Sequence, residues 1–351
     1  MKKKVVWLVA VLVIIAVVMV AVLTDGKKEK KEAVETGKLQ IGMSFDSFVI
    51  ERWLRDRDVF VSTAKELGAE VNVQNANGDI EEQKKQIDYF IEKGMDAIVI
   101  ISVDSYGLRD QVKKAQDAGI KVVAYDRLIT EADVDLYISF DNSRVGDMMG
   151  ETLVRNGIRG GKVLMLGGSL RDSNVPLVEG AFKDVMRENE VSLLYSFHAD
   201  NWEAELAAQY VHEHLDVVAK ADAIMCGNDN LATQVVRALS ERRMAGNILV
   251  VGQDADLEAC QRIVEGTQLM TVYKPVEKLA QRAAECTIQL IKEDKVTGED
   301  VETMDDGRYE VPYVAIEPIS VTDANIDEVI IDSGFHLKED IYLNVPGKMP
   351  K

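Results

Sequence analysis

The chain has 351 residues, which is longer than a typical single domain, so we expect two lobes and a sizeable core. Hydrophobic residues make up 47% and charged residues 29% of the chain, with only 6 prolines and 24 glycines, a composition that excludes a disordered or fibrous protein. Acidic residues outnumber basic residues by 60 to 41, and the net charge of −19 repels phosphate backbones, so we expect no nucleic-acid partner.

An apolar run occupies the N-terminal end of the sequence. It extends from Val5 to Leu23, follows the lysine cluster Lys2–Lys4, and would form about 28 Å of helix at roughly 1.5 Å per residue, enough to span a bilayer. A secretory signal normally has a shorter apolar region and a small-x-small cleavage site, which is not evident after Leu23. We therefore predict that residues 1–24 are an uncleaved signal anchor that keeps the lysines inside and the protein at the extracytoplasmic face of the cell membrane. A cleaved signal peptide and a secreted protein are the alternative.

A polar segment separates this run from the rest of the chain. Residues 25–38 are rich in Lys and Glu, and as a flexible coil the segment would reach roughly 20 Å from end to end. We interpret it as a tether.

A helix-glycine-strand pattern recurs after Lys38. Gly68, Gly94 and Gly119 each precede a strand-like run, namely EVNVQNA, DAIVII and KVVAYD, and each lies where a helix needs a left-handed C-terminal cap. The runs are apolar on both faces, as buried parallel strands are. The pattern returns after Asn142 with KVLMLGG, AIMCGND, NILVVGQDA and QLMTVYK, so we predict an α/β fold with a doubly wound parallel sheet and a second sheet after it.

Planar polar side chains follow most of these strands. Ligands of open α/β sheets bind beyond the carboxyl ends of the strands, so these residues are the first candidates for a site. Each of them could instead cap the helix that follows. Trp53 and Trp202 lie in polar neighbourhoods of the sequence, and two indoles beside a cluster of Asp, Asn and Arg suit a sugar, whose C–H faces stack on rings and whose hydroxyls need planar partners.

Other chemistries find little support. The chain has no GxSxG elbow, no phosphate-binding GxxxxGK[ST] loop and no GxGxxG after a strand, so we expect neither an enzyme nor a cofactor. The four histidines, His198, His212, His214 and His336, are scattered, and we expect them to be solvated rather than to bind a metal. The cysteines Cys226, Cys260 and Cys286 are odd in number and widely spaced, so we expect buried apolar residues without a disulfide.

The segment from Lys38 to about Thr322 resembles the periplasmic sugar-binding proteins of the ribose/galactose/xylose type, nearest to their D-xylose-binding members. The matching motifs are ERWLRDRD, VQNANGD, AYDR, YISFDN, LGGS, GNDN, GQDADL and GTQLMTVYKP. The resemblance implies a periplasmic binding protein type I fold, in which two Rossmann-like lobes with parallel sheets are joined by three crossovers and close on one D-xylose or similar aldopentose without changing it. It places the N-terminal lobe at 39–143 plus 275–312 and the C-terminal lobe at 144–274 plus 313–351. Carried onto matching positions, the sugar contacts are Arg52, Trp53, Asp126, Arg127, Asp172, Asn174, Trp202, Asn228, Asp254 and Lys274.

The sequence leaves two kinds of membrane protein open as the partner. No cysteine directly follows the apolar run, so the lipid anchor common among related receptors of ABC permeases is missing. A protein held at the membrane by residues 1–24 could instead report lobe closure to a sensor histidine kinase, which is the role we favour. The receptor role for an ABC permease is the alternative, and a sugar-active enzyme is less favoured. A sugar-responsive repressor would carry a helix-turn-helix where this chain has its apolar run.

Overall fold

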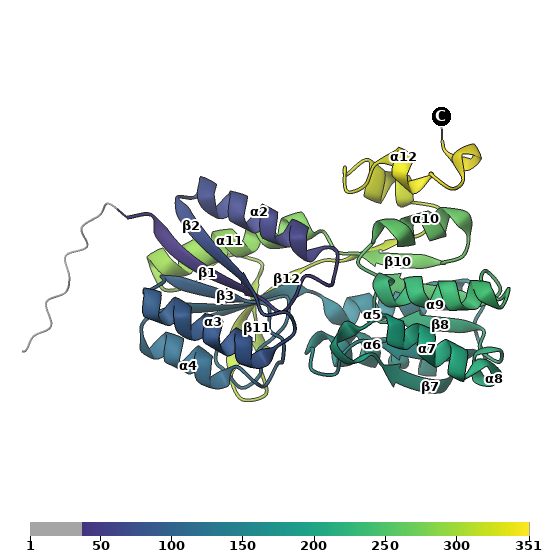
Figure 1. Ribbon diagram of the computed structural model, residues 1–351, viewed down its shortest axis with the longest axis horizontal. Coiled ribbons are helices and arrows are strands. Elements are labelled where there is room, and N and C mark those ends of the chain that lie inside the picture. The colour runs from purple at the N-terminus through teal and green to yellow at the C-terminus, as the bar shows by residue number, and fades with distance from the viewer. Residues whose placement is uncertain (1–36, 351) are drawn as a thin grey trace, which may run out of the picture. The chain divides into compact units, whose positions relative to one another are not determined.

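The computed structural model describes residues 37–350 (Figure 1). The predicted signal anchor at 1–24 and all but the last two residues of the predicted tether lie outside the described residues. Leu39–Lys351 form one compact unit of the chain, and its secondary structure is arranged around two sheets. No helix within residues 37–350 is long and apolar enough to cross a membrane.

The first sheet has seven strands in the order β11-β12-β5-β4-β3-β1-β2, parallel except for the β11–β12 hairpin. Helices α2 and α11 lie against one face, and α3 and α4 against the other (Figure 1). The strands are Leu39–Phe45 (β1), Ala69–Asn75 (β2), Ala97–Ile100 (β3), Lys121–Tyr125 (β4), Leu136–Phe140 (β5), Val301–Asp305 (β11) and Glu310–Ile316 (β12). The helices are Trp53–Glu66 (α2), Ile80–Lys93 (α3), Arg109–Asp117 (α4) and Val276–Glu293 (α11).

The second sheet has six strands in the order β13-β10-β9-β8-β6-β7, parallel except for the β10–β13 pair. The strands are Lys162–Gly167 (β6), Ser192–His198 (β7), Ala223–Cys226 (β8), Leu249–Gln253 (β9), Met270–Tyr273 (β10) and Ile319–Val321 (β13). The helices are Asn142–Arg155 (α5), Asn174–Glu188 (α6), Glu205–Glu213 (α7), Leu215–Val218 (α8), Asp229–Glu241 (α9), Leu257–Glu265 (α10) and Lys338–Ile341 (α12), with short turns at Asp200–Trp202, Asp327–Ile331 and Pro346–Lys348. The predicted class, two α/β lobes with mostly parallel sheets, is confirmed.

The glycine pattern explains where the helices of the first lobe end. Gly68, Gly94 and Gly119 have positive φ angles of 91°, 66° and 78°, a conformation that glycine adopts without steric cost. At the other end of α3, the side chain of Asp79 accepts hydrogen bonds from the backbone N–H groups of Glu81 and Glu82. Local sequence signals therefore set both ends of this helix.

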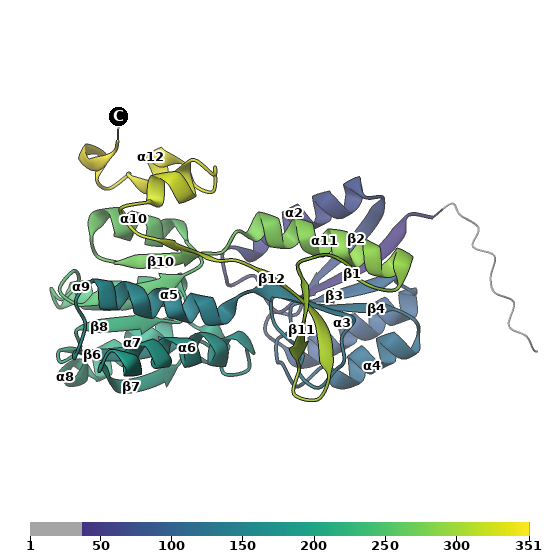
Figure 2. The same cartoon turned by 180° about the vertical axis from the view of Figure 1, so that it is seen from behind.

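Three crossovers connect the two sheets. The chain passes from β5 to α5 after Phe140, from β10 to α11 after Tyr273, and from β12 to β13 after Ile316 (Figure 2). The boundary placed between residues 312 and 313 falls inside β12 and is too early. The reason is that β12 stays paired with β5 from Tyr313 to Ile316, so its whole length belongs to the first sheet.

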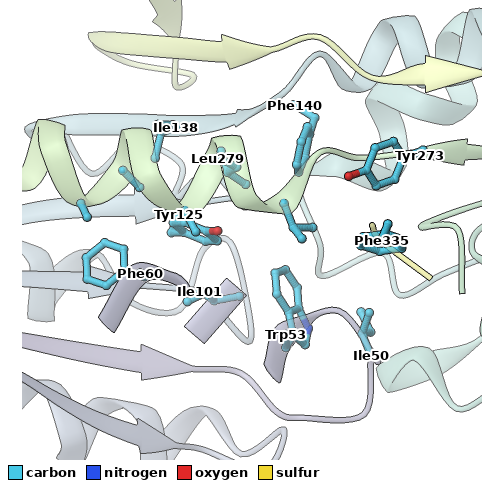
Figure 3. Close-up of a cluster of buried hydrophobic side chains, with 14 of the residues drawn as sticks. Ile50, Trp53, Phe60, Ile101, Tyr125, Ile138, Phe140, Tyr273, Leu279 and Phe335 are labelled. Atoms are coloured by element: carbon cyan, nitrogen blue, oxygen red, sulfur yellow. The ribbon is translucent and has the colours of Figure 1, made fainter. Parts of the chain in front are cut away.

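A large apolar cluster fills the space between α2, α11 and the first sheet. Trp53, Phe60, Tyr125 and Phe140 are buried in it and Leu279 packs from α11, as Figure 3 shows. Cys260 and Cys286 belong to the same cluster, and Cys226 is buried in the second lobe. All three cysteines are free and buried, as the sequence predicts.

Candidate binding site

One cavity lies where strand ends of both sheets face each other. The empty space between its lining atoms, counted out to the open solvent, is about 460 Å³. All ten residues predicted from the sequence line it: Arg52, Trp53, Asp126, Arg127, Asp172, Asn174, Trp202, Asn228, Asp254 and Lys274. Their convergence is a finding of the structure, whereas their contact with a sugar stays a prediction.

The strand-end rule explains why these residues meet. Asp126, Asn228 and Asp254 come one or two residues after β4, β8 and β9, at the carboxyl edges of the two sheets. Asp126 and Asp254 have positive φ angles of 64° and 98°, which are uncommon outside glycine and concentrate at functional sites. The helix-capping alternative also holds for Asn228, whose side chain accepts a hydrogen bond of 2.9 Å from the Leu231 N–H.

A buried charge network surrounds Arg52. Its guanidinium donates to Asp126 and lies 3.5 Å from Asp56 Oδ1 and 3.8 Å from Asp254 Oδ1. Asp254 Oδ1 is in turn 3.2 Å from Lys274 Nζ. Two cations thus share the carboxylates of one wall, so every charge there has an opposite partner.

The electrostatics of this network keep its main groups ionised. Burial alone would lower the pKa of Arg52, but the carboxylates of Asp126, Asp56 and Asp254 outweigh it and raise that pKa. Burial would raise the pKa of Asp126, but Arg52, Lys274 and Arg127 hold it below its usual range. Behind the network, burial raises the pKa of Asp56 to about 7 despite Arg52 and a hydrogen bond from the Tyr125 hydroxyl. Asp126 is therefore available as a charged acceptor for a ligand hydroxyl.

A second charge cluster is centred on Arg127. Its Nη1 donates to Asp46 Oδ2 at 2.6 Å and to the Ser102 carbonyl at 3.0 Å, and its Nε lies 2.6 Å from Asp172 Oδ2. Asp46 and Arg127 belong to the first lobe and Asp172 to the second. The Arg127–Asp172 pair therefore joins the lobes across the cavity.

The two tryptophans add apolar surface and hydrogen-bond donors. The guanidinium carbon of Arg52 lies 4.1 Å from the Trp53 ring centroid, and Gly168 contacts the Trp202 ring so closely that a Cβ there would overlap it. Both indole Nε1 groups are buried without a hydrogen-bond partner among residues 37–350. Buried indole N–H groups usually find an acceptor, so these two are suited to a ligand oxygen.

Comparison with known proteins shows which family has this architecture. The profile described as "Periplasmic binding protein domain" matches residues 41–295. The chain belongs to this family. It is 41% identical over 309 residues to the "D-xylose-binding periplasmic protein" of Haemophilus influenzae, which covers 87% of this chain and 92% of that protein. The protein of the same name in Escherichia coli is 38% identical over 314 residues, with coverages of 88% and 94%.

Solved structures of binding proteins share the fold. An ABC transporter solute binding protein from Clostridium phytofermentans with bound β-D-glucose superposes with a TM-score of 0.77 at 26% identity, covering 86% of this chain and 99% of that one. The relatives are named as binding proteins, and the expectation that this periplasmic binding protein is not an enzyme is confirmed.

Sequence reasoning missed several residues of the cavity wall. Glu179 projects from the second turn of α6, far along the sequence from any strand end, and no signal in the sequence points to it. Its Oε1 lies 2.8 Å from His198 Nε2. Gln253 ends β9 directly before Asp254, so the strand-end rule could have included it.

Three histidines are not solvated as expected. His198 is held by Glu179, the half-buried His214 has its Nδ1 3.0 Å from the Tyr210 carbonyl, and the half-buried His336 has its Nε2 2.8 Å from the Ala255 carbonyl. The prediction was wrong for these three, because burial follows tertiary packing rather than sequence spacing. Within residues 37–350, no group of three or more His, Cys, Asp or Glu side chains is arranged to hold a metal ion.

Proposed function

We propose that this periplasmic binding protein binds D-xylose or a closely similar aldopentose, one molecule per chain, without chemical change. The observation that carries the proposal is the single cavity in which ten planar, charged and aromatic residues from both lobes converge. The names of the relatives in Haemophilus influenzae and Escherichia coli support D-xylose over other sugars.

The chemistry of the wall suits a polyhydroxylated ring. Carboxylates such as Asp126 and Asp254 accept hydrogen bonds from hydroxyls, while Arg52 and Lys274 donate to the same hydroxyl oxygens. The indole of Trp53 offers an apolar face for the C–H groups of the ring. Each sugar hydroxyl can thereby act as donor and acceptor at once.

Titration calorimetry tests the ligand directly on residues 38–351 with a panel of pentoses and hexoses. We expect tight binding of D-xylose at one site, with no effect of added metal. Replacing Arg127 or Asp254 by Ala should weaken binding at least about tenfold, because each removes a charge-assisted hydrogen bond. His212→Ala, an exposed position away from the cavity, should be silent. Tight binding of ribose or galactose without xylose, or consumption of the sugar, would contradict the proposal.

We further propose that residues 1–24 anchor the protein at the extracytoplasmic face of the membrane and that lobe closure signals to a sensor histidine kinase. The 19-residue apolar run and the lysines before it support the anchor. The alternative, a receptor for an ABC permease, is supported by the description of the Clostridium phytofermentans structure as an ABC transporter solute binding protein.

Fractionation of the full-length protein separates these roles. An anchored protein should stay with membranes in high salt, because salt does not weaken burial of apolar residues. Sugar-dependent co-purification with a membrane kinase would support the sensor role, and association only with a permease would support transport. A soluble protein whose mature N-terminus begins near Thr24 would exclude the anchor.

A further inference from the structure

A second cavity lies directly outside the first. It has an empty volume of about 630 Å³ and shares three lining residues with the inner cavity: Arg127, Asp172 and Trp202. Asp46 and Asn77 of the first lobe and Asn201 and Glu203 of the second line only the outer cavity. The shared residues therefore form a wall between the two cavities.

The outer cavity is built from unusual backbone. Asn77, Asn201 and Trp202 line it and have positive φ angles of 51°, 51° and 60°. Non-glycine residues in this region cost free energy and persist where the surrounding structure holds them, commonly at functional sites. The outer cavity is thus lined by strained backbone from both lobes.

Asp46 is the residue that holds the wall from outside. It follows β1 and accepts a 2.6 Å hydrogen bond from Arg127 Nη1. Asp172 forms an ion pair with the Nε of the same guanidinium. Asp46 itself is fixed, since its carbonyl accepts a 2.7 Å hydrogen bond from the Gly78 N–H. Asp46 and Arg127 follow strands of one sheet, so their contact does not depend on how far the lobes close.

We propose that Asp46 is a positioning residue: it fixes the Arg127 guanidinium across the opening of the inner cavity, so that the site admits a single sugar ring and excludes a ring that carries a further sugar unit. The inference rests on the proposed function and deepens it. With Arg127 anchored on both sides, the two cavities stay separate and a disaccharide has no continuous space. Without Asp46 the Nη1 side of the guanidinium keeps only a neutral acceptor, the Ser102 carbonyl at 3.0 Å, so Arg127 is held less firmly on the outer side of the wall.

The test uses Asp46→Asn, which keeps the shape of the side chain and removes its charge. Glu203→Gln is the matched control, because it removes one negative charge from the exposed side of the same cavity without any contact to Arg127. The ligands are D-xylose and xylobiose. Calorimetry measures both affinities, and stopped-flow measures the rate of D-xylose dissociation.

For Asp46→Asn we expect D-xylose to dissociate about tenfold faster and the affinity for xylobiose relative to D-xylose to rise at least about fivefold, because a bond between two opposite charges is replaced by a weaker bond to a neutral amide oxygen. Glu203→Gln should keep both values within about twofold. The ratio of two affinities does not depend on how much protein is folded, so reduced stability alone cannot produce the change. Wild-type values for both quantities in Asp46→Asn would overturn the inference. Failure of the wild-type protein to bind D-xylose would instead overturn the proposed function.

Discussion

Asn174, the first residue of α6 in the second lobe, donates hydrogen bonds to both the backbone carbonyl (3.1 Å) and the carboxylate Oδ1 (3.0 Å) of Asp126 in the first lobe. Its own side-chain oxygen accepts from Asn142 Nδ2 at 3.1 Å, so the amide is held on both sides. Asn174 and Asp126 also line the inner cavity. Contact between the lobes and recognition of a ligand therefore use the same side chains, which couples binding to closure.

Replacing Asn174 by Asp tests this coupling. The new carboxylate would face that of Asp126, and repulsion between like charges should disfavour the closed arrangement. We expect the affinity for D-xylose to fall at least about tenfold, because the free energy of closure is part of the free energy of binding. Small-angle scattering should show that the wild-type protein contracts when D-xylose is added and that the variant needs far more sugar to do so.

Asn189→Asp is the control, since it makes the same substitution at the opposite end of α6. It should bind D-xylose as the wild-type protein does. An unchanged radius of gyration for wild type with and without saturating sugar would contradict the coupling.

Two substitutions separate the hydrogen-bonding role of the Trp53 indole from its packing role. Trp53→Phe keeps an aromatic face but removes the buried, unpaired Nε1–H, so we expect D-xylose to bind roughly five- to tenfold more weakly if the ligand accepts from it. Trp53→Ala also removes packing from the large apolar cluster and should cost about 3–5 kcal/mol of unfolding free energy. Calorimetry and urea unfolding measure the two effects. Equal binding by wild type and Trp53→Phe would show that the N–H does not contact the sugar.

Local rules account for much of this site. Residues such as Asp126 and Asp254 could be predicted because parallel strands end at a common edge, and that rule needs only the strand pattern. Glu179 could not, because it sits within a helix and reaches the cavity only through the packing of α6. The lobe boundary at residues 312 and 313 was placed too early for a similar reason: the pairing of β12 with β5, more than 170 residues earlier in the sequence, decides how far the first lobe extends.

A buried network behind Asp254 supports the loop that carries it. The Thr271 hydroxyl donates to Asp229 Oδ2 at 2.6 Å and accepts from the Ala255 N–H at 3.1 Å, next to the strained backbone of Asp254. Burial raises the pKa of Asp229 to about 7, although its hydrogen bonds oppose the shift. Thr271 therefore links a buried carboxyl to the loop of the site.

Thr271→Val keeps the shape of the side chain and removes both hydrogen bonds. We expect a loss of about 1–3 kcal/mol in unfolding free energy, because Asp229 and the Ala255 N–H lose a buried partner. D-xylose should bind several-fold more weakly, because the Asp254 loop loses its support. Thr287→Val is the control, since that fully buried hydroxyl bonds only the Ala283 carbonyl within α11. It should leave sugar affinity unchanged, and equal affinity losses in the two variants would argue against a specific role for Thr271.

The same loop is held from the C-terminal segment by His336, whose side chain carries a pH-dependent prediction. His336 Nε2 donates to the Ala255 carbonyl at 2.8 Å, and the neighbouring ring of Phe335 packs on Tyr273 (Figure 3). Burial lowers the pKa of His336 below its usual value of 6.5, while the bond to Ala255 and the charge of Glu51 oppose the shift. The folded protein thus keeps this imidazole neutral at pH values where the unfolded chain already binds a proton.

Because the pKa is lower in the folded state, the contribution of His336 to stability is complete above pH 6.5 and is lost as the pH falls through the lower, folded-state pKa. His336→Gln can still donate an N–H to Ala255 but does not titrate. We expect its unfolding free energy, measured with urea, to fall less than that of wild type between pH 7.5 and pH 5. The difference in D-xylose affinity between the two proteins should develop over the same pH range. His212→Gln, at an exposed position, should show the wild-type profile. If His336→Gln and wild type lose equal stability over this range, proton uptake at His336 does not destabilise the loop that carries Asp254.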